Sequence, residues 1–199
     1  MKWLFNLLVA VGLGIVSGCS TVPITGRSQF SLVSESTMVG MAGDQYAQVK
    51  KQTPLSTDQA RTAMVKNAGR RISVAVEEYL RANGLANRSN DFAWEFNLFE
   101  SDEVNAWAMP GGKIAFYSGI MDACRNEAGV AVVMSHEIGH VVARHGAERF
   151  SQQLLTQLGG VALMVALRDE PAKTQTAWLA AYGAGTTIGV ILPYSRAHF

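Results

Sequence analysis

One stretch of the sequence decides the fold: residues 126–145, which read NEAGVAVVMSHEIGHVVARH. Asn126 is a typical N-cap, and the apolar residues after it predict a helix over 127–145. The pattern H-E-x-x-H lies inside this helix. At about 100° per residue, His136 and His140 fall about 40° apart, on one face and one turn from each other.

These residue types at this spacing predict a metal site. Two imidazoles one turn apart can both bind a Zn²⁺ ion at about 2.0–2.1 Å. Glu137 is adjacent and can take a proton from a water without being a ligand. Polar residues are costly on a helix otherwise suited to burial, and a bound metal would explain them. We therefore predict one Zn²⁺ per chain, with His136 and His140 as ligands and Glu137 as the catalytic base.

The third ligand is not predicted within this helix. In a continuous helix His145 would point about 140° away from His140 and about 180° away from His136, which favours a surface or supporting role. Glu127 and Glu148 are also badly placed. Because catalytic zinc needs three protein ligands, the third must come from elsewhere in the chain.

Composition limits the classes of function. The 199 residues suit one domain with attachments, and 48% of them are hydrophobic. Lys and Arg number 17 against 16 Asp and Glu, a net charge of +1, which predicts no nucleic-acid partner. Two cysteines exclude a disulfide-rich scaffold. Cys124 is expected to be a small buried residue, with a nucleophilic thiol as the weaker alternative.

The N-terminus has the features of a targeting signal. The apolar run 3–16 is too short to span a bilayer comfortably, and residues 1–18 are predicted to be a lipoprotein signal peptide. The ending VSGC resembles the bacterial lipobox, so Cys19 is the expected lipidation site. An ordinary secretory signal with an incidental cysteine is the alternative. Ser20 after the cysteine favours the outer membrane, by resemblance to sorting in Gram-negative bacteria.

The mature chain divides into a Ser- and Thr-rich lipidated tether over 19–36 and one domain over 37–199. Alternating residues over 92–98 predict a half-buried strand, and the apolar segment 154–167 predicts a buried helix, or alternatively a hairpin that dips into the membrane. The other predicted elements are helices over 38–51, 56–82 (with Ser56 as its cap) and 177–192, and strands over 104–108 and 114–117.

Two motifs resemble one known family. The stretch from His136 to His140, together with Ala-Arg-His over 143–145, resembles the metallopeptidase family of the CAAX prenyl protease, HtpX and the mitochondrial Oma-type enzymes. NAWAMPGG over 105–112 looks like the N-A-x-A-x-P-G-G element of that family. The lipobox and the segment 23–27 make an outer-membrane lipoprotein protease the nearest likeness. The resemblance implies an α+β, mainly α, gluzincin-like domain with a small sheet beside the H-E-x-x-H helix.

The resemblance also implies a departure at the end of the sequence. After a Leu-Pro-Tyr-Ser-Arg pattern the family has a Glu, the third zinc ligand, followed by Ala-Asp. Here Phe199 stands at the ligand position, so the domain is expected to be C-terminally incomplete or degenerate, with His198 as a weak substitute ligand. The missing Asp would have oriented a zinc-bound histidine.

Two functions remain open on the sequence alone. The first is a zinc endopeptidase on the periplasmic face of the outer membrane that degrades unfolded or misfolded periplasmic and outer-membrane proteins. The alternative is an inactive lipoprotein that binds unfolded chains or a partner protease. An edge strand near 107–117 could bind an extended substrate by its main chain. Asn105 is a candidate for contacting the substrate backbone, or else it closes a turn.

Overall fold

The computed structural model describes residues 19–21 and 28–187. Its chain divides after Ala147 into two compact units. The single domain expected over 37–199 stays a prediction. The predicted signal peptide (1–18), the segment 23–27 and Phe199 lie outside the described residues.

A small mixed sheet lies at the centre of the first unit. Its strands are β3 (Glu95–Phe99), β4 (Ala106–Met109) and β5 (Lys113–Tyr117), in the order β3-β5-β4. β5 runs parallel to β3 and antiparallel to β4. The tight turn between β4 and β5 depends on Gly111 and Gly112, whose φ values are +79° and +83°. The predicted α+β fold, mainly α with a small sheet, is confirmed.

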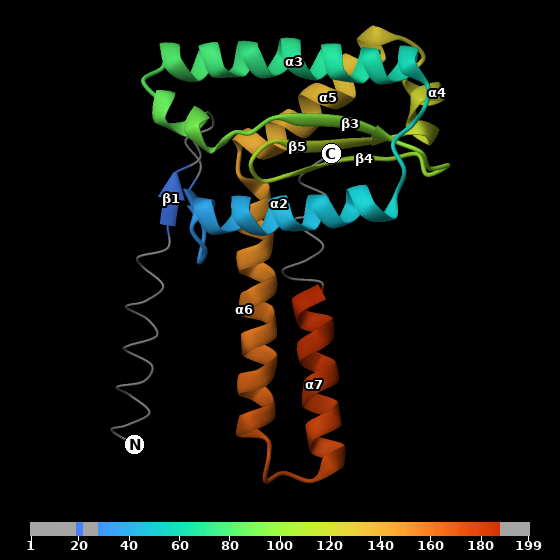
Figure 1. Ribbon diagram of the computed structural model, residues 1–199. Coiled ribbons are helices and arrows are strands. Elements are labelled where there is room, and N and C mark those ends of the chain that lie inside the picture. Colours follow the sequence, from blue (N-terminus) through green and yellow to red (C-terminus); the bar gives the residue numbers. More distant parts are fainter. Residues whose placement is uncertain (1–18, 22–27, 188–199) are drawn as a thin grey trace. The chain divides into compact units, whose positions relative to one another are not determined.

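Helices cover both faces of the sheet (Figure 1). α2 (Glu35–Gln52) lies on one face, and α3 (Gln59–Ala82) and α5 (Glu127–Val142) lie on the other. The remaining elements are β1 (Cys19–Thr21), β2 (Ser28–Phe30), the 3-10 helices η1 (Ala86–Asp91) and η2 (Ser118–Ile120), α4 (Met121–Cys124), α6 (His145–Ala166) and α7 (Ala172–Thr186).

Alternation along the strands produces two cores. On β5, Ile114 and Phe116 pack on the side of α3 and α5, whereas Ala115 packs with Tyr46 of α2 and with Phe99. All five side chains are at most 1% exposed. The strand predicted near 92–98 begins at Glu95, and its alternation holds: Phe96 and Leu98 pack on the side of α3 and α5, and the Glu95 side chain on the other side is 32% exposed. α2 covers the end of that second face, where Asn97 is 8% exposed.

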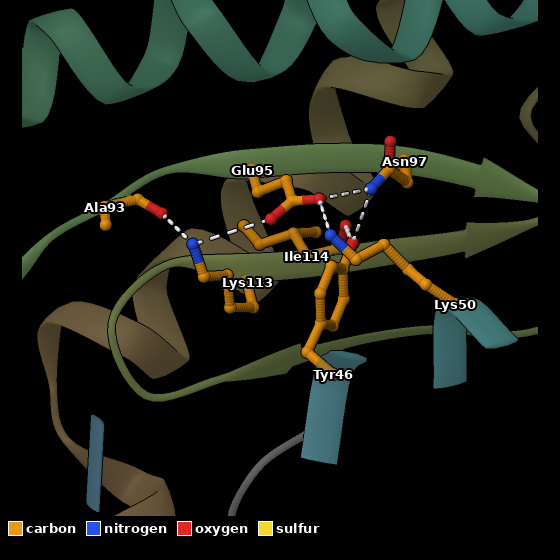
Figure 2. A network of polar contacts seen from close by, with 7 residues as sticks. All are labelled: Tyr46, Lys50, Ala93, Glu95, Asn97, Lys113 and Ile114. Carbon is orange, nitrogen blue, oxygen red and sulfur yellow. Dashed lines mark hydrogen bonds and ion pairs between the residues drawn. The ribbon is translucent and has the colours of Figure 1, made fainter. Parts of the chain in front are cut away.

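A polar network joins α2 to the sheet (Figure 2). The Tyr46 hydroxyl donates to the carbonyl of Ile114 at 3.0 Å and accepts from Asn97 Nδ2 at 3.1 Å. Glu95 accepts hydrogen bonds from Asn97 and from Lys50, at 3.0 and 2.8 Å. Burial raises the pKa of Tyr46 above its ordinary value. Burial alone would raise the pKa of Glu95, but the hydrogen bonds from Lys50 and Asn97 outweigh it and lower the pKa. The network therefore holds a neutral phenol and an ionised carboxylate between α2 and the sheet.

Side-chain caps explain where the helices begin. Asn126 Oδ1 accepts from the backbone N–H of Gly129 at 3.1 Å, which confirms the predicted cap. α3 is capped by Asp58, whose carboxylate accepts from Arg61 N at 2.9 Å, and not by Ser56 as predicted. Cys124, just before α5, is a buried free thiol as expected, and burial raises its pKa.

Part of the predicted tether is folded. β1 pairs antiparallel with β2, in a register that brings Cys19 opposite Phe30. Gln29 is 2% exposed, and its Nε2 donates to the carbonyl of Arg144 at 2.7 Å. The stretch around Gln29 is thus attached to the first unit.

The second unit contains a helical hairpin formed by α6 and α7. Tyr182 of α7 donates its hydroxyl hydrogen to the carbonyl of Thr156 at 2.8 Å and packs where Gly159 has no side chain. The sequence predicted a buried helix over 154–167, but Leu158 is 55% exposed and Val161 51%. The prediction of a helix over this segment is confirmed, and the prediction that the helix is buried was wrong. Among the described helices, none is both long and apolar enough to cross a membrane.

Candidate metal centre

The helix α5 presents two different faces, because its residues follow the 3.6-residue period. Val130, Met134 and Ile138 are at most 1% exposed and pack into the core beneath. His136 is exposed on the opposite side, and His140 is half-buried at the edge of that face. The core residues therefore fix the orientation of the helix, and the two histidines project together as predicted.

The two imidazoles converge through the same type of nitrogen. His136 Nε2 and His140 Nε2 are 3.0 Å apart, and the ring planes are inclined at 84°. Two tetrahedral zinc ligands with Zn–N bonds of about 2.0–2.1 Å would have their nitrogens about 3.3 Å apart. The observed separation is within a few tenths of an ångström of that value. The pair thus fits a shared metal ion with little rearrangement.

Glu137 lies between the two histidines in sequence and is buried. Its residue is 8% exposed, and burial raises the pKa of its carboxyl from an ordinary value near 4.5 to about 7. No hydrogen bond or ion pair to this carboxyl is found among the described residues. A carboxyl whose pKa is near neutral is suited to accept and return a proton.

The structure corrects the prediction for His145. α5 ends at Val142, and Arg144 adopts a left-handed conformation with φ of +57°, after which α6 begins at His145. The break turns His145 back, so that its Nδ1 lies 2.7 Å from Nδ1 of His140. The predicted direction assumed an unbroken helix and was wrong. The supporting role expected for this residue remains compatible with the contact.

A small cavity lies beside His140. It measures about 30 Å³, and the end of β4 lines it through Ala108 and Met109, together with Glu35 of α2 and Arg144. A space of that size holds about one water molecule among polar groups. The end of the edge strand and the second histidine therefore share one pocket.

Asn105 precedes β4 and closes a turn. Its Nδ2 donates to Glu103 Oε1 at 3.1 Å, and its carbonyl accepts from Tyr117 N at 3.1 Å. The first bond engages its side chain and the second its backbone, both within the described chain. Contact with a substrate remains a prediction for this residue.

The described residues do not contain a complete ligand set. Within 19–21 and 28–187 no group of three His, Cys, Asp or Glu side chains is placed to hold a metal. Glu127 faces Arg71 of α3 at 3.4 Å, away from the histidines, as its position in the sequence predicted. A larger groove of about 980 Å³ between α3 and α5 is lined by residues such as Ile72, Val76 and Ala131 and by none of the histidines.

The fold and the site together define the class of H-E-x-x-H metal-site proteins: a helix on a small sheet, two convergent imidazoles and a buried glutamate between them in sequence. The family model described as "Peptidase family M48" matches residues 66–198, and the chain belongs to this family. The family assignment, including its Oma-type members, confirms the resemblance inferred from the motifs.

The relatives agree with this assignment. "Mitochondrial metalloendopeptidase OMA1" of Schizosaccharomyces pombe is 31% identical over 154 residues, which cover 75% of this chain and 42% of the relative. The protein of that name in Saccharomyces cerevisiae is 28% identical, over 81% of this chain and 48% of the relative. "Beta-barrel assembly-enhancing protease" of Escherichia coli strain K12 is 29% identical, over 94% of this chain and 38% of the relative. The chain thus spans less than half the length of these relatives.

Proposed function

We propose that this chain is the catalytic domain of a zinc-dependent endopeptidase of the bacterial cell envelope, with a gluzincin-like arrangement of its site. The observation that carries the proposal is the 3.0 Å approach of His136 Nε2 to His140 Nε2, next to the buried Glu137. Membership of peptidase family M48 and relatives named as metalloendopeptidases support it.

His136 and His140 would hold the zinc ion through their Nε2 atoms. When bound, zinc supplies a Lewis acid and a water that is nucleophilic at neutral pH. Glu137 accepts the proton of the attacking water, and it returns that proton to the amine that leaves when the peptide bond breaks. Its pKa of about 7 matches both roles, because the carboxyl can be charged or neutral at little cost near neutral pH.

The substrate backbone would lie along β4. This strand is at one edge of the sheet order β3-β5-β4, and its end lines the cavity next to His140. An extended peptide can add to such an edge through main-chain hydrogen bonds, which folded proteins cannot offer from their paired strands. Unfolded or misfolded envelope proteins are therefore the proposed substrates, and Asn105, at the start of β4, is the candidate contact to their backbone.

The proposed location is the periplasmic face of the outer membrane. Cys19, lipidated after removal of residues 1–18, would anchor the domain, because several acyl chains on one residue give stable membrane binding. The relative named "Beta-barrel assembly-enhancing protease" covers 94% of this chain, which favours envelope proteins as substrates and possible partner proteases in the same compartment.

The test compares two polypeptides. One is the 199-residue chain, and the other carries Glu in place of Phe199 followed by the Ala-Asp of the family pattern. We expect the longer form to hold one zinc per chain by metal analysis and to cleave unfolded casein faster than a folded protein. Glu137→Ala in the longer form should abolish cleavage and retain zinc. A zinc-loaded longer form that cleaves no unfolded protein would refute the proposal.

The second candidate function is that of an inactive lipoprotein that binds unfolded chains or a partner protease, and weak zinc binding by the protein would favour it. The 199-residue form tests this directly. Tightly held zinc together with steady peptidase turnover in that form would exclude the second function.

A further inference from the structure

The backbone between α5 and α6 has an unusual conformation at one residue. Arg144 has φ of +57°, a left-handed conformation that a residue with a Cβ rarely adopts. Nothing in the local sequence favours it, since neither glycine nor asparagine stands at this position. Tertiary contacts must therefore maintain it.

Three contacts hold Arg144 in place. Its guanidinium lies 3.2 Å from Glu35 Oε2 of α2 and 2.9 Å from Asp91 Oδ2 at the end of η1. Its carbonyl accepts from Gln29 Nε2 of β2 at 2.7 Å. The three partners come from three different elements, all N-terminal to the metal-site helix.

The ion pairs are shielded from water. The side chain of Glu35 is 14% exposed and that of Arg144 is 24% exposed, so water screens the pair less than an ordinary surface ion pair. Removing the guanidinium would leave a partly buried carboxylate without its partner.

The consequence of the break is the position of His145. An unbroken helix would direct this side chain away from His140, yet the two Nδ1 atoms are 2.7 Å apart and the ring centroids 4.9 Å apart. A hydrogen bond between two Nδ1 atoms requires that one carries a proton and the other does not. When His140 Nδ1 carries it, the lone pair of His140 Nε2 points at His136 Nε2, 3.0 Å away, which is the direction that a metal ion shared by the two rings requires.

We propose that Arg144 is a positioning residue of the metal site: its ties to Glu35, Asp91 and Gln29 hold the break that brings His145 against His140 and thereby fix the proton of His140 on Nδ1. This inference rests on the proposed function in one respect, that His140 binds the metal through Nε2. The arrangement of the proton itself exists in the metal-free protein, so it can be measured without any peptidase assay.

The first experiment records ¹⁵N chemical shifts of the imidazole nitrogens in the metal-free 199-residue chain. The spectra are recorded at about pH 8. We expect the proton of His140 to lie mainly on Nδ1 in the wild type and to move toward Nε2 in Arg144→Gln and in His145→Ala. Unchanged shifts of His140 in Arg144→Gln would overturn the proposal.

Two further variants separate positioning from folding. Arg144→Gly permits the left-handed backbone and keeps the carbonyl that accepts from Gln29, but it removes both ion pairs, so it should remain folded and still alter the His140 shifts. The matched control is Arg61→Gln, because Arg61 also bridges two carboxylates, Asp58 at 3.4 Å and Asp122 at 2.8 Å, away from the histidines. The control should leave the His140 shifts unchanged, and a change as large as in Arg144→Gln would count against the proposal.

The second readout is zinc affinity, measured by competition with a chromophoric chelator. Loss of a residue that orients a metal-bound histidine commonly lowers affinity by about 10–100-fold, so Arg144→Gln and His145→Ala should each lose about tenfold. Because Arg144 acts through His145, the double variant should lose no more than His145→Ala alone. A double variant whose loss of zinc affinity equals the product of the two single losses would show that Arg144 does not act through His145, and it would refute the inference. Altered His140 shifts in a chain without peptidase activity would instead support this inference and contradict only the proposed function.

Discussion

Replacing Glu137 by glutamine should abolish activity and at the same time stabilise the metal-free protein. The native carboxyl is 8% exposed, and burial raises its pKa from near 4.5 to about 7. The native state therefore binds more protons than the unfolded state between these two pH values. The contribution of this group to stability is complete below pH 4.5 and is lost as the pH rises to about 7. Glutamine has nearly the same shape and no charge, so it avoids this loss.

The magnitude follows from the pKa. Moving a pKa from 4.5 to about 7 corresponds to about 3 kcal/mol, at 1.36 kcal/mol per pH unit. Water that reaches the open side of the helix reduces this value, and we expect about 2 kcal/mol at pH 8. For a chain of 199 residues this raises the melting temperature by about 4–8 °C.

The assay is thermal and urea unfolding of both proteins in chelator, from pH 4 to pH 8. The variant and the wild type share all histidines, so the difference between their stabilities isolates Glu137. It should be small near pH 4 and grow with pH. Glu78→Gln, at an exposed glutamate of α3, is the control and should show no such growth. A Glu137→Gln protein no more stable than wild type at pH 8 would refute the argument that burial acts on this carboxyl.

Three other perturbations test the anchor and the packing. Cys19→Ala should release the protein from the membrane fraction, because it removes the proposed acylation site; full retention with membranes would place the anchor elsewhere. Gly112→Ala should destabilise the protein by about 2 kcal/mol or more, since alanine is strained at φ of +83° and its Cβ would lie 2.5 Å from Trp94 Cε3; urea unfolding measures this, and an unchanged midpoint would contradict it. Tyr46→Phe should cost about 1–3 kcal/mol by removing a buried hydroxyl with two hydrogen-bond partners, whereas Tyr79→Phe, 49% exposed, should change stability by less than about 0.5 kcal/mol; equal effects would argue against the network in Figure 2.

The local sequence was sufficient to predict those features that depend only on residues a few positions apart. The period of the helix places His136 and His140 one turn apart, whatever surrounds them. The cap at Asn126 also acts within a few residues, and the structure has it where it was predicted. The turn at Gly111 and Gly112 likewise depends on the backbone of these two residues. The family resemblance depended on the same short motifs.

Burial could not be read from one strand or one helix alone. Alternation over 92–98 predicted one face open to water, and Glu95 stays 32% exposed there, but α2 packs over the end of the strand and Asn97 and Phe99 are buried. The apolar run over 154–167 predicted a buried helix, yet much of its surface is exposed in the hairpin with α7. Whether an apolar side chain is covered depends on which distant segment packs on it, and hydrophobicity alone does not specify that segment.

The sequence by itself determined which residue types stand at H-E-x-x-H spacing and that they lie on a helix, and from these it predicted the chemistry of the site. The tertiary structure alone decided the position of His145. Helical periodicity directs that residue away from His140, and the reversal comes from Arg144, held in a left-handed conformation by Gln29, Glu35 and Asp91. Asp91 is 53 positions and Gln29 is 115 positions away from Arg144 in the sequence. A pattern confined to neighbouring residues therefore could not have revealed these contacts. A strained backbone conformation persists only where such distant contacts outweigh its local cost.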